Sequence, residues 1–258
     1  MNIVVLAKEV PDTYGDRKLS LETGLADRGA SEVVLDEIGE RSVEAALSYA
    51  DKHEGTEVVV VSMGPESATA TIRKALAMGA HRALHVVDES LLGADLGLTA
   101  EVLAAAIRRV GFDLVIAGNL STDGSGGVMA AMLGELLGVP AVTALAALDI
   151  EADRVAGTRV TDDGTARVSA PLPAVVSITE ALPDARFPNF KGIMAAKKKP
   201  FEVVSTADLG VDAAAADASR SIMLAVSQKP PRQAGTKIVD EGDAGEKLAE
   251  FLVSNRLA

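Results

Sequence analysis

Residues 114–137 read LVIAGNLSTDGSGGVMAAMLGELL and contain one complete structural unit. Residues 114–116 are too apolar to face water, which is typical of a strand covered by helices on both sides. A glycine-rich loop follows. Beyond it, apolar residues recur at helical spacing, namely Met129, Met132, Leu133 and Leu136. The stretch therefore predicts a buried strand, a loop and an amphipathic helix.

The same unit recurs upstream of this stretch. Short apolar runs occupy residues 3–6, 58–61 and 83–87, and stretches with helical spacing follow them. The helical stripes consist of Val43, Ala46, Leu47 and Ala50, then Ala68, Ile72 and Leu76, then Leu103, Ile107 and Val110. Alternation of this kind predicts an α/β fold with an open, mostly parallel, doubly wound sheet.

The pattern changes after residue 140. Apolar runs at 147–150, 154–160 and 166–168 surround a turn at Asp162, Asp163 and Gly164, which predicts an antiparallel hairpin insert. Residues 174–178 would return the chain to the sheet. Periodicity then fades, and only residues 243–254 again look helical, with Leu248, Phe251 and Leu252 on one side.

Three regions are therefore expected along the chain. Residues 1–184 would form the α/β nucleotide-binding domain, residues 185–200 a partner-recognition loop, and residues 201–258 an extended C-terminal arm that packs on a partner subunit. A loosely ordered tail is the alternative for the last region.

Composition excludes several kinds of site and partner. The 258 residues contain no cysteine, which excludes disulfides, thiolate nucleophiles, iron–sulfur clusters and cysteine-rich zinc sites. A net charge of -12 makes nucleic acid a poor partner. Because neither a signal peptide nor a membrane-spanning run is visible, we expect a soluble, cytoplasmic protein.

The glycine-rich loop is the strongest candidate binding site. Glycine permits close approach of the backbone, so successive N–H groups can converge on an anion at the start of a helix. The loop lacks the lysine of a P-loop and follows the fourth predicted strand, unlike a dinucleotide-binding fingerprint. The alternative is an ordinary connection in which Asp123 or Ser125 caps the helix. The loop residues are Gly118, Asn119, Leu120, Ser121, Thr122, Asp123, Gly124, Ser125, Gly126 and Gly127.

Other residues fall near the same edge of the predicted sheet. Ala7, Met63 and Gly118 occupy the carboxyl ends of strands, where ligands bind in open α/β sheets. In contrast, the histidines His53, His81 and His85 have no companions typical of a metal site. No acid–base constellation is visible, so we expect no catalytic side chains and no metal.

Residues 185–200 read ARFPNFKGIMAAKKKP and reverse the overall acidity, with five basic residues and no acid. Phe187, Phe190, Ile193 and Met194 are interleaved with the charges. Apolar anchors among lysines would suit docking onto an acidic protein surface, while a solvated basic face is the alternative. The three consecutive lysines are Lys197, Lys198 and Lys199.

Together with LPAVVSITEALPDARFP at 172–188, this segment resembles the signature of the electron-transfer flavoprotein beta-subunit family. Four other stretches resemble the family in the same order. They read VVLAKEVPD (4–12), SMGPESATATIRKALAMGAHRALHV (62–86), AGNLSTDGSGG (117–127) and PPRQAGTKI (230–238). The resemblance implies a fold of the adenine-nucleotide alpha-hydrolase type.

The resemblance also implies cofactors and partners. The chain would pair with a larger alpha subunit, which would hold most of the single FAD, and would itself bind AMP structurally. Electrons would arrive from acyl-CoA and related dehydrogenases, as in fatty acid oxidation, and leave toward a quinone reductase at the membrane. The redox chemistry would belong to the flavin.

Particular residues acquire roles through the same resemblance. The family positions near the flavin ring match Tyr14 and Ile38, and the position of an apolar anchor for dehydrogenases matches Phe190. The AMP contacts match Ala7, Asp36, Glu37, Ile38, Gly39, Met63, the loop from Gly118 to Gly127, Val128 and Met129.

Three other functions remain open. A bifurcating relative would hold a second FAD in place of AMP, but residues 123–128 lack the Thr and Gln typical of that loop. A stand-alone, stress-protein-like nucleotide-binding module would share the sheet and loop but leave residues 185–200 unexplained. A nucleic-acid binder would depend on three lysines in an acidic chain and should dissociate readily in salt.

Overall fold

The computed structural model describes residues 1–15, 17–215, 217–232, 234–235, 237 and 239–257. The chain divides into two compact units, Met1–Leu224 and Ala225–Ala258. Part of the motif at 230–238 lies outside the described residues, at positions 233, 236 and 238. Among the described residues, none of the helices combines the length and apolar character needed to cross a membrane.

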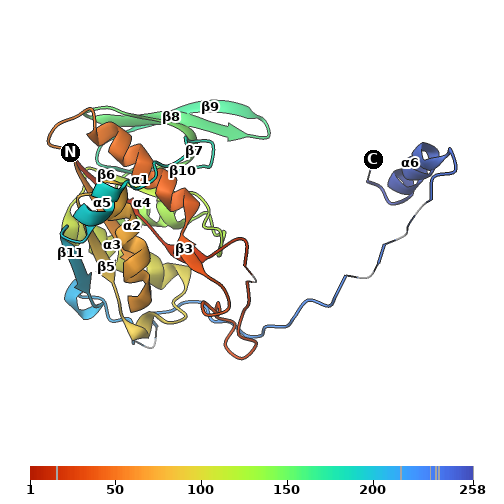
Figure 1. Cartoon of the computed structure of the whole chain (residues 1–258), viewed down its shortest axis with the longest axis horizontal. Coiled ribbons are helices and arrows are strands. Elements are labelled where there is room, and N and C mark those ends of the chain that lie inside the picture. Colours follow the sequence, from red (N-terminus) through yellow and green to blue (C-terminus); the bar gives the residue numbers. More distant parts are fainter. Residues whose placement is uncertain (16, 216, 233, 236, 238, 258) are drawn as a thin grey trace. The chain divides into compact units, whose positions relative to one another are not determined.

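A single large sheet organises the first unit and confirms the predicted α/β fold (Figure 1). Its strand order is β11-β5-β4-β1-β6-β10-β7-β8-β9. All neighbours from β11 to β7 are parallel, and β8 and β9 continue the sheet as antiparallel strands. The strands of this sheet are β1 (Asn2–Leu6), β4 (Glu57–Met63), β5 (Arg82–Val86), β6 (Leu114–Gly118), β7 (Ala141–Ile150), β8 (Arg154–Thr161), β9 (Gly164–Pro171), β10 (Ala174–Ile178) and β11 (Phe201–Val204).

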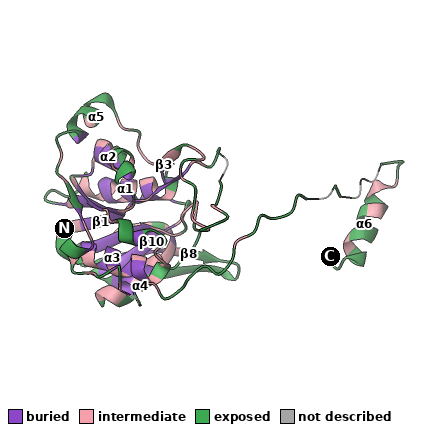
Figure 2. Cartoon of the chain, turned by 90° about the horizontal axis from the view of Figure 1, so that it is seen from below, coloured by how far each residue is buried: buried purple, intermediate pink, exposed green. Residues whose placement is uncertain are grey.

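Helices cover both faces of this sheet. In Figure 2, α1, α2 and α5 lie on one side of the strands, and α3 and α4 lie on the other. The helices are α1 (Glu37–Ala50), α2 (Thr69–Met78), α3 (Leu96–Val110), α4 (Met129–Leu137), α5 (Phe190–Ala196) and, in the second unit, α6 (Ala244–Ser254). Short 3-10 turns occur at η1 (Glu66–Ala68), η2 (Glu89–Leu91) and η3 (Ala207–Leu209).

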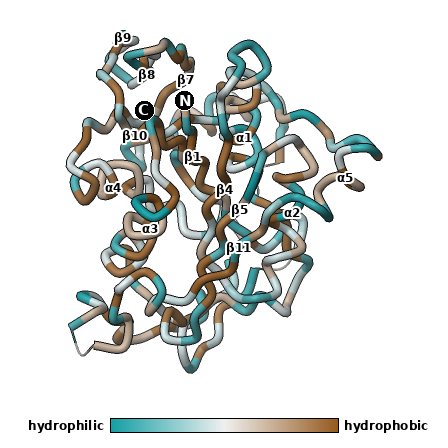
Figure 3. The backbone as a smooth tube through the Cα atoms, turned by 90° about the vertical axis from the view of Figure 1, so that its left-hand side faces the viewer, coloured by the Kyte–Doolittle hydropathy of each residue, from teal (hydrophilic) through white to brown (hydrophobic). Residues whose placement is uncertain are grey.

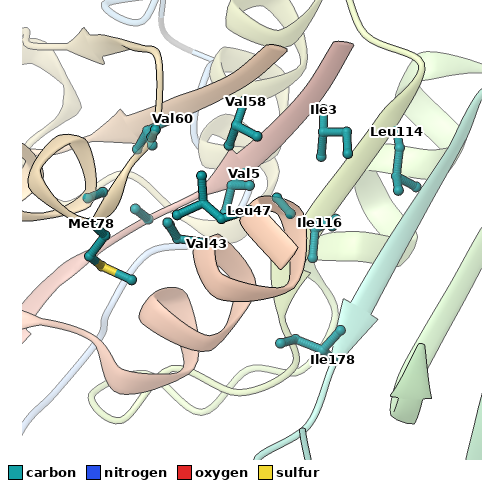
Figure 4. Close-up of a cluster of buried hydrophobic side chains, with 14 of the residues drawn as sticks. Ile3, Val5, Val43, Leu47, Val58, Val60, Met78, Leu114, Ile116 and Ile178 are labelled. Atoms are coloured by element: carbon teal, nitrogen blue, oxygen red, sulfur yellow. The ribbon is translucent and has the colours of Figure 1, made fainter. Parts of the chain in front are cut away.

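The predicted helical stripes form the two cores. On one face, Val43 and Leu47 of α1 pack over Val5, Val58 and other strand residues (Figure 4). Leu103 and Ile107 of α3 belong to the opposite core. Figure 3 shows the apolar residues concentrated along the central strands. Each fully buried Val, Leu or Ile side chain contributes roughly 1.5–3 kcal/mol, so these stripes hold the helices on the sheet.

The predicted hairpin insert is confirmed and is longer than expected. β8 and β9 pair from Arg154 opposite Pro171 to Thr161 opposite Gly164. Gly157 faces a register shift in β7, and a Cβ there would lie 2.3 Å from the carbonyl oxygen of Ala147. The glycine therefore permits the close approach of β8 to the irregular part of β7.

Several elements were not anticipated from the sequence. The connection after β1 contains two short antiparallel strands, β2 (Glu9–Pro11) and β3 (Val33–Leu35). Residues 190–196, expected to lie in a loop, form α5, and β11 extends the sheet beyond β5. The first unit thus continues well past residue 184, whereas the helix predicted at 243–254 is confirmed as α6.

Candidate functional site

The strand order reverses beside β1. The chain passes from β1 to β4 and β5 on one side and then returns to β6 on the other side of β1. Ala7 follows β1, Met63 ends β4 and Gly118 ends β6, so the three predicted strand ends do lie along one edge of the sheet. Open α/β sheets bind ligands at this kind of reversal. We call the region beyond the carboxyl ends of β1 and β6 the switch crevice, a name that marks its place in the sheet.

The start of α1 closes one side of the switch crevice. A Cβ on Gly118 would lie 2.5 Å from Cγ2 of Ile38, so Ile38 rests directly on the glycine backbone. Gly39 is buried and faces Ala7, with 3.6 Å between a Cβ on Gly39 and Cα of Ala7. Glu37 is exposed. Residues 36–39 and 118 are therefore neighbours, although 79 positions separate Gly39 from Gly118.

Asp36 is the buried acid of the switch crevice. Its Oδ2 accepts a hydrogen bond from the backbone N–H of Thr122 at 3.1 Å. Burial raises the pKa of Asp36, against the lowering effect of the N–H groups of Thr122 and Ile38. Within the described residues, Asp36 Oδ1 and Thr122 Oγ1 are buried without a hydrogen-bond partner. Buried polar atoms of this kind require a ligand or water to satisfy them.

Two cationic side chains from the connection between β1 and β3 bind the glycine-rich loop. Lys8 Nζ lies 2.7 Å from Asp123 Oδ1, and Arg17 donates to the carbonyl oxygen of Thr122. Burial alone would raise the pKa of Asp123, but the hydrogen bond and charge of Lys8 lower it overall. Sequence reasoning missed Lys8 and Arg17. Lys8 carried a detectable signal, since it follows a parallel strand by two residues.

The loop leaves the start of α4 without a side-chain cap. Val128 is the N-cap residue and makes no side-chain hydrogen bond, so neither Asp123 nor Ser125 caps the helix. Instead, the Ser125 hydroxyl donates to the Ser121 carbonyl oxygen at 3.1 Å. The predicted cap by Asp123 or Ser125 is therefore wrong. Uncapped N–H groups at a helix start favour an anion.

The backbone of the loop changes direction sharply before α4. Gly127 has φ +68° and Ser125 has φ +49°, so the chain turns through the left-handed region twice before α4. Gly124 and Gly126 are exposed, as is Val128, while Met129 is half-buried. The loop therefore offers its backbone to the surface.

The remaining loop residues have different surroundings. Asn119 joins the loop to β10, because its N–H donates to the Ile178 carbonyl oxygen at 2.8 Å and its Oδ1 accepts from the Ser177 hydroxyl. The side chain of Leu120 is exposed. Tyr14, the other residue expected near the flavin, is 99% exposed.

The recognition segment, residues 185–200, presents its apolar side chains to solvent. Phe187 is 93% exposed and Phe190 is 79% exposed, and Ile193 and Met194 are each nearly half exposed. A buried Phe190 would have excluded a docking role, and the side chain is not buried. The segment thus presents large apolar groups at the surface of the first unit.

The three lysines of this segment are not equivalent. Lys197 and Lys198 are exposed. Lys199 Nζ donates to the carbonyl oxygens of Leu76, Gly79 and Ala80 at 2.6–3.0 Å, and burial lowers its pKa. The charge of Lys199 therefore stabilises the C-terminal end of α2.

The histidines show no arrangement suited to a metal. His85 lies inside β5 and is fully buried. The N–H of Val58 donates to His81 Nδ1 at 3.0 Å, and His53 stacks on Tyr49. Across the described ranges, no group of three or more His, Asp or Glu residues could hold a metal ion.

Comparison with known proteins identifies the family. Residues 23–209 match the family described as Electron transfer flavoprotein domain. The electron transfer flavoprotein subunit beta of Mycobacterium leprae (strain TN) is 46% identical over 264 residues, covering 99% of each chain. The same subunit of Syntrophomonas wolfei is 36% identical, covering 98% of this chain and 96% of the relative. Subunit CarD of the Caffeyl-CoA reductase-Etf complex of Acetobacterium woodii is 33% identical, covering 98% and 97%.

The family match spans the glycine-rich loop, residues 36–39 of the switch crevice and the recognition segment, while the end of β1 lies before it. The identity to the subunits named beta extends over nearly the whole chain. This chain therefore belongs to the electron transfer flavoprotein family as a beta subunit, an electron carrier subunit.

Proposed function

We propose that this chain pairs with an electron transfer flavoprotein alpha subunit, helps to hold one FAD, binds AMP in the switch crevice and docks dehydrogenases through the recognition segment. Electrons would pass from acyl-CoA and related dehydrogenases to a quinone reductase at the membrane. The observation that carries the AMP part is the pair of buried, unpartnered atoms beside an uncapped helix start, Asp36 Oδ1 and Thr122 Oγ1.

The residues of the switch crevice fit an adenylate in three respects. The uncapped start of α4 favours the negative charge of a phosphate. Lys8 offsets the charge of Asp123, so the loop does not present an uncompensated carboxylate to that phosphate. The unpartnered atoms of Asp36 and Thr122 could bond ribose or base groups. Ala7, Met63 and Gly118 would line the crevice with backbone and small or flexible side chains.

The fit to FAD depends on Tyr14 and Ile38. Tyr14 is almost fully exposed, which suits a side chain that a cofactor or a partner covers. Ile38 rests on Gly118, so an apolar group lies next to the switch crevice. When bound, FAD would supply the acceptance and release of electrons, while these two residues would shield and position its ring.

The docking role depends on exposed apolar groups among positive charges. Phe190 and Phe187 would insert into an apolar pocket of a dehydrogenase, and Lys197 and Lys198 would steer an acidic surface toward them. Ile193 and Met194 extend the same apolar surface. Localisation in the cytoplasm remains part of this proposal.

Co-expression with an alpha subunit tests the proposal. We expect a coloured heterodimer that releases one FAD and one AMP on denaturation, measured by chromatography of the extract. A colourless, monomeric chain would refute the proposed subunit role. Two FAD and no AMP would indicate a bifurcating subunit instead. Turnover of ATP by the isolated chain would favour the stand-alone nucleotide-binding module, and family membership already weighs against that function.

A further inference from the structure

The recognition segment crosses the outside of the molecule between two distant strands. It begins after β10 and ends at β11, with β6, β1, β4 and β5 between them in the sheet. Figure 2 shows α5 outside α1 and α2, which themselves cover the sheet. The segment therefore forms an outer layer that rests on helices and not on strands.

Arg186 fastens the beginning of this segment to α1. Its Nε lies 2.6 Å from Glu44 Oε2, and its Nη2 lies 2.9 Å from both Glu44 Oε1 and Asp51 Oδ2. The backbone N–H of Arg186 also donates to Glu44 Oε2 at 3.0 Å. One guanidinium thus joins Glu44 of α1 to Asp51, the C-cap residue of that helix about two turns further on, through a planar fork geometry that lysine cannot reproduce.

Burial and a hydrogen bond from Ser48 hold the Glu44 carboxylate in place for this contact. Its side chain is only 15% exposed, and Ser48 donates to Oε1 at 2.8 Å. Burial would raise the pKa of Glu44, but the hydrogen bonds from Arg186 lower it overall. The hydrogen bonds to Glu44 raise the pKa of Arg186. The pair is more protected from water than a surface ion pair, which commonly contributes only about 0–1 kcal/mol.

The end of the segment is fastened to α2. Gly192 packs so closely that a Cβ there would lie 2.4 Å from the Ala77 carbonyl oxygen. Arg73 donates to the Ala196 carbonyl oxygen at 3.1 Å, and Ala196 is buried. Lys199 completes the attachment through its three carbonyl contacts. The exposed side chains between these two attachments stand on a fixed backbone.

We propose that Arg186, through Glu44 and Asp51, is a positioning residue that holds Phe190 in the orientation required for docking. The inference rests on the proposed docking function of the recognition segment. Only four positions separate Arg186 from Phe190, and Asn189, which caps α5 by accepting the Gly192 N–H at 2.8 Å, lies between them. Holding Arg186 thus fixes the start of α5.

A fixed segment matters for an electron carrier in two ways. A preorganised anchor avoids the entropy cost of ordering a mobile loop on binding. In addition, α1 carries Glu44 as well as Ile38 at the switch crevice, and Asp51 caps its C-terminal end, so one helix relates the docking surface to the proposed flavin side of the subunit. A loose segment would allow docked orientations with longer paths for the electron.

The test uses the heterodimer with Arg186→Met, Arg186→Lys and a matched control. Arg154→Met breaks the exposed Arg154–Glu151 pair, 2.7 Å long, in the distant hairpin. Two quantities are measured, namely hydrogen exchange of the Gly192 and Ile193 amides, which bond to Asn189, and steady-state reduction by a purified acyl-CoA dehydrogenase. Flavin content and thermal unfolding show whether each variant is folded.

We expect Arg186→Met to speed exchange of both amides and to raise the KM for the dehydrogenase roughly tenfold, with kcat changed less than about twofold. Arg186→Lys should lie between Arg186→Met and the wild type, and Arg154→Met should match the wild type. If Arg186→Met unfolds the chain, the test rests on Arg186→Lys, which should exchange the two amides faster than the wild type and show a higher KM.

Unchanged exchange in Arg186→Met would overturn the inference whatever the dehydrogenase kinetics. Faster exchange with an unchanged KM would overturn the positioning role. Phe190→Ala in the same assay separates the two proposals. If Phe190→Ala raises KM and Arg186→Met does not, only the positioning role fails. If neither variant changes KM, the proposed docking function fails as well.

Discussion

The switch crevice and the recognition segment use opposite means to present a surface. The crevice relies on backbone and on small residues, as at Gly118, where Ile38 touches the main chain. The recognition segment relies on large side chains, since Phe187 and Phe190 project into solvent while Arg186 and Lys199 hold the backbone. Adding atoms should therefore damage the crevice, whereas removing atoms should damage the segment.

The largest effect is expected from adding one methyl group to the crevice. In Gly118→Ala the new Cβ would lie 2.5–3.1 Å from three side-chain atoms of Ile38, so the Ile38 side chain or the start of α1 has to shift. Overpacking of this kind costs about 1–3 kcal/mol. We expect a lower midpoint in urea unfolding and loss of AMP from the purified heterodimer.

Two further variants test the cause of that effect. Ile38→Ala combined with Gly118→Ala should recover most of the lost free energy of unfolding, because the clash is removed. Gly29→Ala is a suitable control, since its Cβ would meet only Asp27 Oδ1 at 3.4 Å. Equal destabilisation by Gly118→Ala and Gly29→Ala would contradict the close packing of the crevice.

A smaller effect is expected from truncating Phe190, the proposed docking side chain. Phe190→Ala should raise the KM for an acyl-CoA dehydrogenase by roughly tenfold or more, because central aromatic anchors commonly contribute over 1 kcal/mol. Flavin content and thermal stability should stay unchanged, since the side chain is 79% exposed. Phe187→Ala is the matched comparison within the segment. Identical kinetics for Phe190→Ala and wild type would show that this residue is not an anchor.

The smallest effect concerns the buried acid of the crevice. Because burial raises the pKa of Asp36, the folded state keeps the proton to higher pH than the unfolded state does. Stability contributed by this group is therefore present below the ordinary carboxyl pKa and lost as pH rises through the raised folded pKa.

The substitution Asp36→Asn removes the dependence of stability on pH that comes from this carboxyl group. Its free energy of unfolding at neutral pH should equal or exceed that of the wild type, by at most about 1 kcal/mol, and urea unfolding at acidic and neutral pH measures it. The Asn side-chain oxygen can still accept the N–H of Thr122. If Asp36→Asn is clearly less stable at neutral pH, the charged carboxylate of Asp36 stabilises the fold, which would contradict the prediction.

Much of the fold could be predicted because its signals are local and strong. The runs containing Val4, Val59 and Val115 are apolar on both faces, and each became a central parallel strand. The strand ends that flank the switch crevice could be predicted too, because the carboxyl ends of parallel strands lie along one edge of the sheet. Gly118 to Gly127 could be recognised as a loop because four glycines cluster before an apolar helix.

The missed features depend on distant contacts. β11 has only four residues, and its pairing with β5 joins Phe201 to Ala83, a partner that no local pattern reveals. Lys197, Lys198 and Lys199 look alike in sequence, and only the position of α2 makes the last of them an internal donor. α5 did carry a local signal, because Asn189 is a good N-cap, but seven residues gave too little periodicity to identify it.

The crossing from β10 to β11 has a consequence for limited proteolysis. The exposed peptide around Phe187 and Phe190 is a natural place for a protease to cut. The piece beyond the cut would still add β11 to the edge of β5, while Lys199 would stay bound to α2. A cleaved chain should therefore run as two fragments on a denaturing gel yet stay together in native buffer, with its nucleotide retained and its ability to accept electrons from a dehydrogenase lost.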